Sequence, residues 1–110
     1  MDPKRRPLRP ERIRTLPGSF SYIDRDLLHR GFLRSLGKEE ILLYFFLLLV
    51  AGPEGTSFWS YGRIGKLLKL SEDEVIAALR GLLEKDLVAF RYPTFQVLSL
   101  PPALPREEAP

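Results

Sequence analysis

The sequence lacks cysteine altogether and has only one histidine and one tryptophan among its 110 residues. Without cysteine, neither a disulfide framework nor a thiolate metal site can form. The longest apolar run, Ile41 to Ala51, has eleven residues, whereas a helix that spans a membrane needs about 20. We therefore expect this run to form a buried helix of a soluble domain.

The chain also lacks the combinations of residues that catalysis and ligand binding require. Asp26 precedes His29 by three residues on an expected helix, but two ligands alone do not make a metal site. No nucleophile, general base and orienting group can be assembled. Gly62-x-x-Gly65 has neither the buried strand nor the Lys-Ser pair of a phosphate-binding loop. We therefore predict a non-enzymatic protein with no metal, no cofactor and no small-molecule substrate.

What the chain does contain is typical of one small globular domain. Apolar residues make up 45% and charged residues 28% of the sequence, which is an ordinary globular balance. A length of 110 residues suits a single modest core. The sequence begins Met-Asp-Pro-Lys-Arg-Arg-Pro with no apolar stretch behind it, which is not the pattern of a secretory signal. We therefore expect a cytoplasmic protein.

Charge and proline are distributed unevenly. Residues 1–14 hold six cations and two anions, whereas residues 15–105 hold ten of each. Four of the ten prolines fall in residues 1–17 and four in residues 101–110. These distributions predict a basic, proline-rich and poorly ordered arm (1–18), a folded domain (19–100) and a proline-rich tail (101–110).

The first half of the domain is expected to form two helices. Apolar spacing predicts a short helix that starts at Ser21 or Asp24 and ends near Gly31. A second helix is expected over residues 38–51. Because this helix is apolar nearly all round, we expect it to be the central and most buried element.

The second half is expected to form two more helices and a β-hairpin. A third helix runs from Ser60 to about residue 68, and a fourth begins at Ser71, where Ser71 and Glu74 fit a capping box. Residues 87–91 and 95–99 read as the strands of a hairpin, with a further short β-like segment at 56–59. The predicted fold class is mostly α with a small β-hairpin.

Two helices joined by a tight turn and followed by a hairpin are typical of a winged helix-turn-helix domain. Residues 64–71 (Ile-Gly-Lys-Leu-Leu-Lys-Leu-Ser), with the apolar positions that follow up to Leu87-Val88, resemble the core signature of bacterial winged-helix DNA-binding domains. Residues 22–28 and 43–47 resemble the extra helices of replication-initiator and DnaD-type winged helices. They are also similar to the small helix-turn-helix proteins found beside transposase genes in bacterial mobile elements.

The resemblance implies binding to double-stranded DNA, as a regulator of transcription or an accessory factor of a replication or mobile-element system. It also makes the fourth helix the recognition helix, yet that helix opens Ser71-Glu72-Asp73-Glu74, and carboxylates repel phosphates. We expect Gly81 and Lys85 to share its outward face with the acidic residues. The alternative is therefore a winged helix that binds a protein partner or a second copy of itself, without direct base reading. In this alternative it would dimerise through the first helix, the second helix or the small acidic face of the fourth helix.

The residues assigned to these functions fall into two sets. DNA contacts are assigned to cations of the arm, the third and fourth helices and the hairpin, because cations position a protein on the phosphate backbone. These residues are Lys4, Arg5, Arg6, Arg9, Arg12, Arg14, Arg63, Lys66, Lys69, Arg80 and Arg91. Protein contacts are assigned to Trp59, Ala77 and Gly81, whereas Phe58 is expected to lie in the core.

Overall fold

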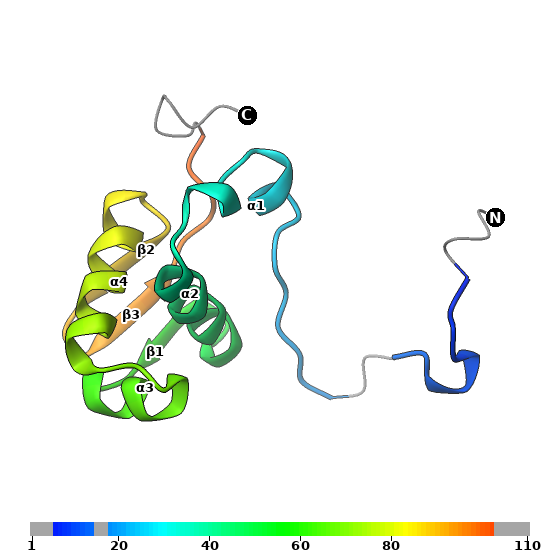
Figure 1. The fold of residues 1–110 in the computed structure, drawn as a ribbon, viewed down its shortest axis with the longest axis horizontal. Helices are drawn as coiled ribbons and strands as arrows, with labels where there is room; N and C mark the ends of the chain where they lie inside the picture. Colours follow the sequence, from blue (N-terminus) through cyan, green and yellow to red (C-terminus); the bar gives the residue numbers. More distant parts are fainter. Residues whose placement is uncertain (1–5, 15–17, 103–110) are drawn as a thin grey trace.

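The computed structural model describes residues 6–14 and 18–102. Within these ranges the folded part contains four α-helices and a three-stranded antiparallel sheet with the strand order β1-β3-β2 (Figure 1). The helices are α1 (Asp26–His29), α2 (Lys38–Val50), α3 (Tyr61–Leu68) and α4 (Glu72–Glu84). The strands are β1 (Thr56–Phe58), β2 (Val88–Arg91) and β3 (Thr94–Val97). The predicted combination of helices with a small antiparallel hairpin is confirmed, and β1 adds a third strand to it.

Helix α1 is shorter than the sequence predicts. The backbone N–H of Asp26 donates to Oδ1 of Asp24 at 2.9 Å, and the helix ends only one turn later, at His29. Leu27 is buried, whereas Ile23 and Leu28 are exposed. Only one of the three apolar residues therefore anchors this helix to the domain.

Helix α2 buries one side and exposes the other. Its buried residues are Leu43, Tyr44, Phe46 and Leu47. Its exposed apolar residues are Ile41, Leu42, Phe45 and Leu49. The prediction that this helix would be the most buried element is wrong, because α4 has the same length and buries five residues against four in α2. None of the helices in the described residues is long and apolar enough to cross a membrane.

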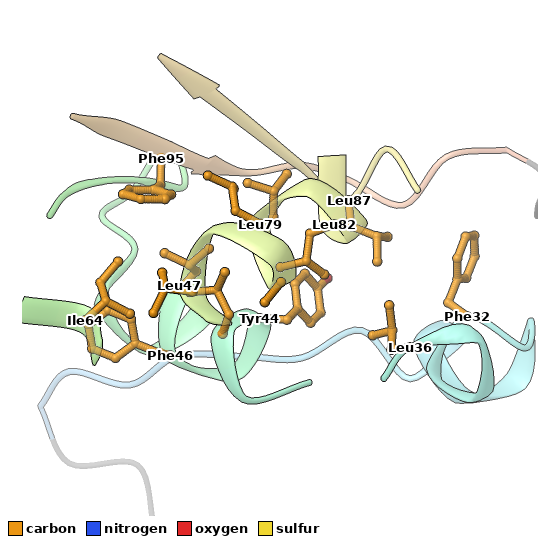
Figure 2. Close-up of a cluster of buried hydrophobic side chains, with 14 of the residues drawn as sticks. Phe32, Leu36, Tyr44, Phe46, Leu47, Ile64, Leu79, Leu82, Leu87 and Phe95 are labelled. Atoms are coloured by element: carbon orange, nitrogen blue, oxygen red, sulfur yellow. The ribbon is translucent and has the colours of Figure 1, made fainter. Parts of the chain in front are cut away.

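The core lies between α2, α4 and the inner face of the sheet (Figure 2). Side chains from each element meet there without solvent contact, among them Leu47 of α2, Ile64 of α3, Leu82 of α4 and Phe95 of β3. Tyr44 is also part of this core, and its burial raises the pKa of its phenol, with a smaller contribution from the nearby Asp24 carboxylate. The phenol of Tyr44 therefore loses its proton only at a higher pH than an exposed tyrosine does.

The register of the sheet decides which aromatic side chains reach the core. Ser57 of β1 pairs with Phe95 of β3, and both are buried on the inner face. Side chains alternate along a strand, so Phe58 points to the outer face opposite Thr94 and is 70% exposed. The prediction that Phe58 belongs to the core is wrong, because Ser57 takes the inward position of β1 and Phe58 takes the outward one.

Candidate nucleic-acid interface

Helix α3 presents three cations on its solvent side. Its N-terminus is capped by Ser60, whose hydroxyl accepts from the backbone N–H of Arg63 at 3.3 Å. Ile64 is buried against the core, so the opposite face of this amphipathic helix is left to solvent. Arg63, Lys66 and Lys69 are all exposed on it or at its end. The structure therefore leaves all three predicted cations exposed on α3 or at its C-terminal end.

A very tight turn fixes α4 next to α3. The backbone N–H of Leu70 donates to the carbonyl of Gly65 at 2.9 Å, and Lys69 adopts a left-handed conformation with φ of 62°. A Cβ atom added to Gly65 would lie 2.5 Å from the carbonyl oxygen of Leu70. Only glycine therefore fits at position 65 without a shift of the backbone of the turn.

This contact predicts opposite effects for two glycine substitutions in the same helix. Gly65→Ala should lower the free energy of unfolding by at least about 1 kcal/mol, because the backbone of the turn must move and overpacking costs ~1–3 kcal/mol. In Gly62→Ala, the control, the added Cβ meets only the mobile carboxylate of Glu72 at 3.1 Å. This variant should be neutral or gain up to about 1 kcal/mol of helix propensity. Urea unfolding would measure both, and equal stabilities would contradict the turn geometry.

The outward face of α4 is mainly acidic. Ser71 and Glu74 form the predicted capping box, in which the backbone N–H of Ser71 donates to Oε1 of Glu74 at 2.8 Å and the N–H of Glu74 donates to the Ser71 hydroxyl at 3.1 Å. The exposed residues of the helix include Glu72, Asp73, Glu74, Ala77, Arg80 and Glu84. Negative charge in the first turn suits the helix dipole, but it leaves Arg80 as the single cation on this face of α4.

Gly81 does not lie on the outward face, contrary to the sequence prediction. It is buried beneath Glu40 of α2, and a Cβ atom at this position would lie 1.6 Å from Oε2 of that carboxylate. Oε1 of Glu40 accepts from the backbone N–H of Gly37 at 2.9 Å and from Lys85 Nζ at 3.4 Å. The close approach that Gly81 permits is therefore made by α2 of the same chain, and of the predicted small pair only Ala77 stays exposed.

An aromatic cluster (Tyr61, Phe90 and Tyr92) connects α3 to the β2–β3 hairpin. The ring centroid of Tyr61 lies 6.0 Å from those of both Phe90 and Tyr92. Tyr92 is 61% exposed at the tip of the hairpin, next to the exposed Arg91. This cluster was not predicted from the sequence, although Phe90 and Tyr92 are only two residues apart at the end of β2 and their ring centroids lie 6.3 Å apart.

Trp59 joins the hairpin tip to the cations of α3. Its backbone N–H donates to the carbonyl of Pro93 at 3.1 Å, and its half-buried ring packs edge-on against Phe46 with centroids 4.9 Å apart. The guanidinium of Arg63 lies over the same ring, 5.1 Å from its centroid. Trp59 therefore acts as a packing residue beneath Arg63, and only part of its ring is available for contacts with other molecules.

The structure places the described cations of the arm apart from those of α3. Arg6, Arg9, Arg12 and Arg14 are exposed, and Figure 1 shows residues 6–14 extending away from the helices. The Arg9 guanidinium donates to Oε2 of Glu11 at 2.8 Å and holds the pKa of that carboxyl below its usual value. The other two predicted arm cations, Lys4 and Arg5, lie outside the described residues.

The described residues contain no group of three His, Asp or Glu side chains that could hold a metal ion. His29 is exposed on α1 and stands apart from the cationic face of α3. The features exposed for binding include the cations, the aromatic hairpin tip and the exposed apolar side of α2. No protein-family model, no curated protein and no solved structure matches this chain.

Proposed function

We propose that α3, α4 and the β2–β3 hairpin form a winged helix-turn-helix unit and that the protein binds double-stranded DNA without catalysing a reaction. In this proposal it is a regulatory or accessory factor of a bacterial replication or mobile-element system and works in the cytoplasm. The observation that carries the proposal is that Arg63, Lys66 and Lys69 are all exposed on α3 or at its C-terminal end. The tight turn and the adjoining hairpin support it further.

The cations suit a contact with the phosphate backbone. Lys66 and Lys69 have no acidic partner within ion-pair distance in the described residues, so they are free to replace counterions on DNA. Arg91 adds a cation at the hairpin, and Arg80 adds one on α4. The arm would follow the phosphates further or enter a minor groove, as cationic arms beside helix-turn-helix units do.

In this mode α4 helps to orient the protein on the DNA and makes few contacts with the edges of the bases. Glu72, Asp73 and Glu84 are exposed on it, and a carboxylate in the major groove can pair only with the amino groups of the bases. The Glu72 side chain lies next to Gly62, in the N-terminal turn of α3, where the helix dipole partly offsets its charge. Most of the binding energy would therefore come from α3 and the arm, and would depend little on sequence.

A second candidate function is docking of a protein partner, without base contacts. The acidic face of α4 favours it, because this face has four exposed carboxylates and one exposed cation. In this alternative Ala77 and the free edge of Trp59 would contact the partner. The two candidates differ in their dependence on the α3 cations, which makes them separable.

The test removes two cations of α3 from the full-length chain. The double variant Lys66→Gln with Lys69→Gln should bind random duplex DNA more weakly in a fluorescence anisotropy titration. Because each lost phosphate contact reduces the salt slope by ~0.9, wild-type affinity should fall about tenfold more than that of the variant between about 50 and 200 mM salt.

The matched control is Arg34→Gln with Lys38→Gln, which removes the same charge from exposed positions away from α3. It should keep nearly the full salt slope of the wild type. Equal losses in both double variants would show that only net charge matters and would overturn the role of α3. Unchanged DNA binding in the α3 variant, together with weaker binding to a protein, would favour the second candidate.

A further inference from the structure

Helix α2 exposes an apolar stripe that the DNA-binding proposal does not use. Ile41, Leu42, Phe45 and Leu49 fall within about a quarter of the helix circumference at ~100° per residue. We call these four residues the α2 stripe. Phe45 at its centre is 48% exposed and Leu49 is 56% exposed. An apolar row of this kind on a helix is the pattern of a face that packs against another element.

The α2 stripe continues into a groove between α1 and α2. Ile23 and Leu28 form one wall of this groove, Ile41 and Phe45 form the other, and buried side chains such as Leu27 form the floor. The groove has a volume of about 440 Å³ and a mostly apolar lining. The short α1 therefore extends the exposed apolar surface of α2 sideways.

The size of this surface matches one half of a dimer interface. The stripe together with Ile23 and Leu28 comprises six large apolar side chains that are 38–64% exposed. A fully exposed aromatic side chain offers ~150–250 Å² and leucine or isoleucine somewhat less, so the six present on the order of 500 Å² of apolar area. The largest apolar patch of a typical monomeric protein covers ~300–600 Å² and often marks a functional surface. A standard interface takes ~800 Å² from each partner, of which ~56–65% is apolar.

The pattern of the stripe is self-complementary. Ile41 and Leu49 each lie four residues from Phe45, one on either side. In an antiparallel pair of α2 helices with Phe45 on the twofold axis, Ile41 meets Leu49 of the partner subunit and Leu49 meets Ile41 of the partner subunit. The antiparallel arrangement also brings the positive end of each helix dipole next to the negative end of the other. Isologous contacts of this type close a dimer.

We propose that the α2 stripe and the adjoining groove bind a second copy of this chain, as an antiparallel α2–α2 dimer with Phe45 at its centre. The dimer carries two α3–α4 units, and it forms whether or not these units bind DNA. The proposal is therefore independent of the proposed function, and its test uses no nucleic acid.

The first test measures the mass of the full-length chain by sedimentation equilibrium over a range of concentrations. The wild type should be a dimer, and Phe45→Glu should raise the dimer dissociation constant at least about a hundredfold, because two carboxylates then face each other on the axis. The control Phe58→Glu makes the same change on the outer face of the sheet, where Phe58 is exposed. This control should leave the dimer intact.

The second test fixes the orientation of the helices and does not depend on the stability of Phe45→Glu. Because the chain has no cysteine, Ile41→Cys and Leu49→Cys each introduce a unique thiol. Under mild oxidation a mixture of the two variants should form a disulfide-linked pair in much higher yield than either variant alone. A wild-type chain that stays monomeric at all concentrations would overturn the proposal. The stripe would then be expected to bind a different protein. Equal cross-linking yields in all three samples would overturn the antiparallel arrangement.

Discussion

Replacing Leu47 with alanine should lower the free energy of unfolding by about 2–5 kcal/mol. Leu47 has no solvent exposure and lies in the middle of α2, where the core cluster surrounds it (Figure 2). The substitution removes three buried carbon atoms and leaves a cavity that the surrounding side chains can close only in part. Urea unfolding would measure the loss, which should appear in the midpoint and not in the slope.

The matched control is Leu49→Ala, the same change two residues further along the same helix. Leu49 is exposed on the α2 stripe, so its truncation should cost less than about 1 kcal/mol, as surface changes usually do. Both variants are best measured in the Phe45→Glu background, because this background removes the contribution of the proposed dimer. Equal losses at Leu47 and Leu49 would contradict the assignment of the two sides of α2.

The comparison of α2 with α4 shows what sequence could predict of this fold. In α4 the apolar spacing predicts one buried face, made of Val75, Ile76, Leu79, Leu82 and Leu83. The structure buries Val75, Leu79 and Leu82, whereas Ile76 is half-buried and Leu83 is exposed at the edge of that face. In α2 apolar residues surround the helix, so their pattern does not indicate which side of the helix is buried. The sequence predicted both helices and the residue at which each begins, but only the packing of α4 and the sheet decided that Leu47 is buried and Phe45 is not.

The candidate site, too, could be predicted from the sequence only in part. The cations of α3 could be assigned from helical spacing, because Arg63 and Lys66 are one turn apart and lie off the buried face formed by Ile64 and Gly65. The aromatic cluster could not be assigned, because Tyr61 and Tyr92 are 31 positions apart in the sequence and meet only through the hairpin. Gly81 was misplaced for a related reason, since its neighbour Glu40 belongs to another helix. Residue spacing within one helix therefore predicted exposed positions, whereas contacts between different elements could not be predicted from the sequence.

The arm is expected to supply the largest share of electrostatic DNA binding. Replacing all six cations of residues 1–14 with glutamine in the full-length chain removes up to six phosphate contacts. At ~0.9 for each contact, the salt slope should fall by up to about 5, and affinity at low salt should fall by several orders of magnitude. The described arm residues are exposed, so the folded domain should keep its circular dichroism spectrum and its stability.

The control for this variant converts the five arginines of the arm to lysine. Lysine keeps the charge but not the planar guanidinium, so non-specific binding to phosphates should persist with nearly the same salt slope. If the glutamine variant bound with the slope of the wild type, the arm would have no part in the interface. The whole electrostatic contribution would then belong to α3, Arg80 and the hairpin.

The central claim, binding to double-stranded DNA through phosphate contacts, is tested most directly by titrating the unmodified chain against random duplex DNA at several salt concentrations. We predict binding whose log K falls linearly with log salt concentration, with a slope steeper than about −3, which corresponds to more than three phosphate contacts. Non-specific DNA binding has a Kd of ~10⁻⁴–10⁻⁶ M at physiological salt. A duplex that stays unbound at about 100 μM protein and about 50 mM salt would contradict the claim.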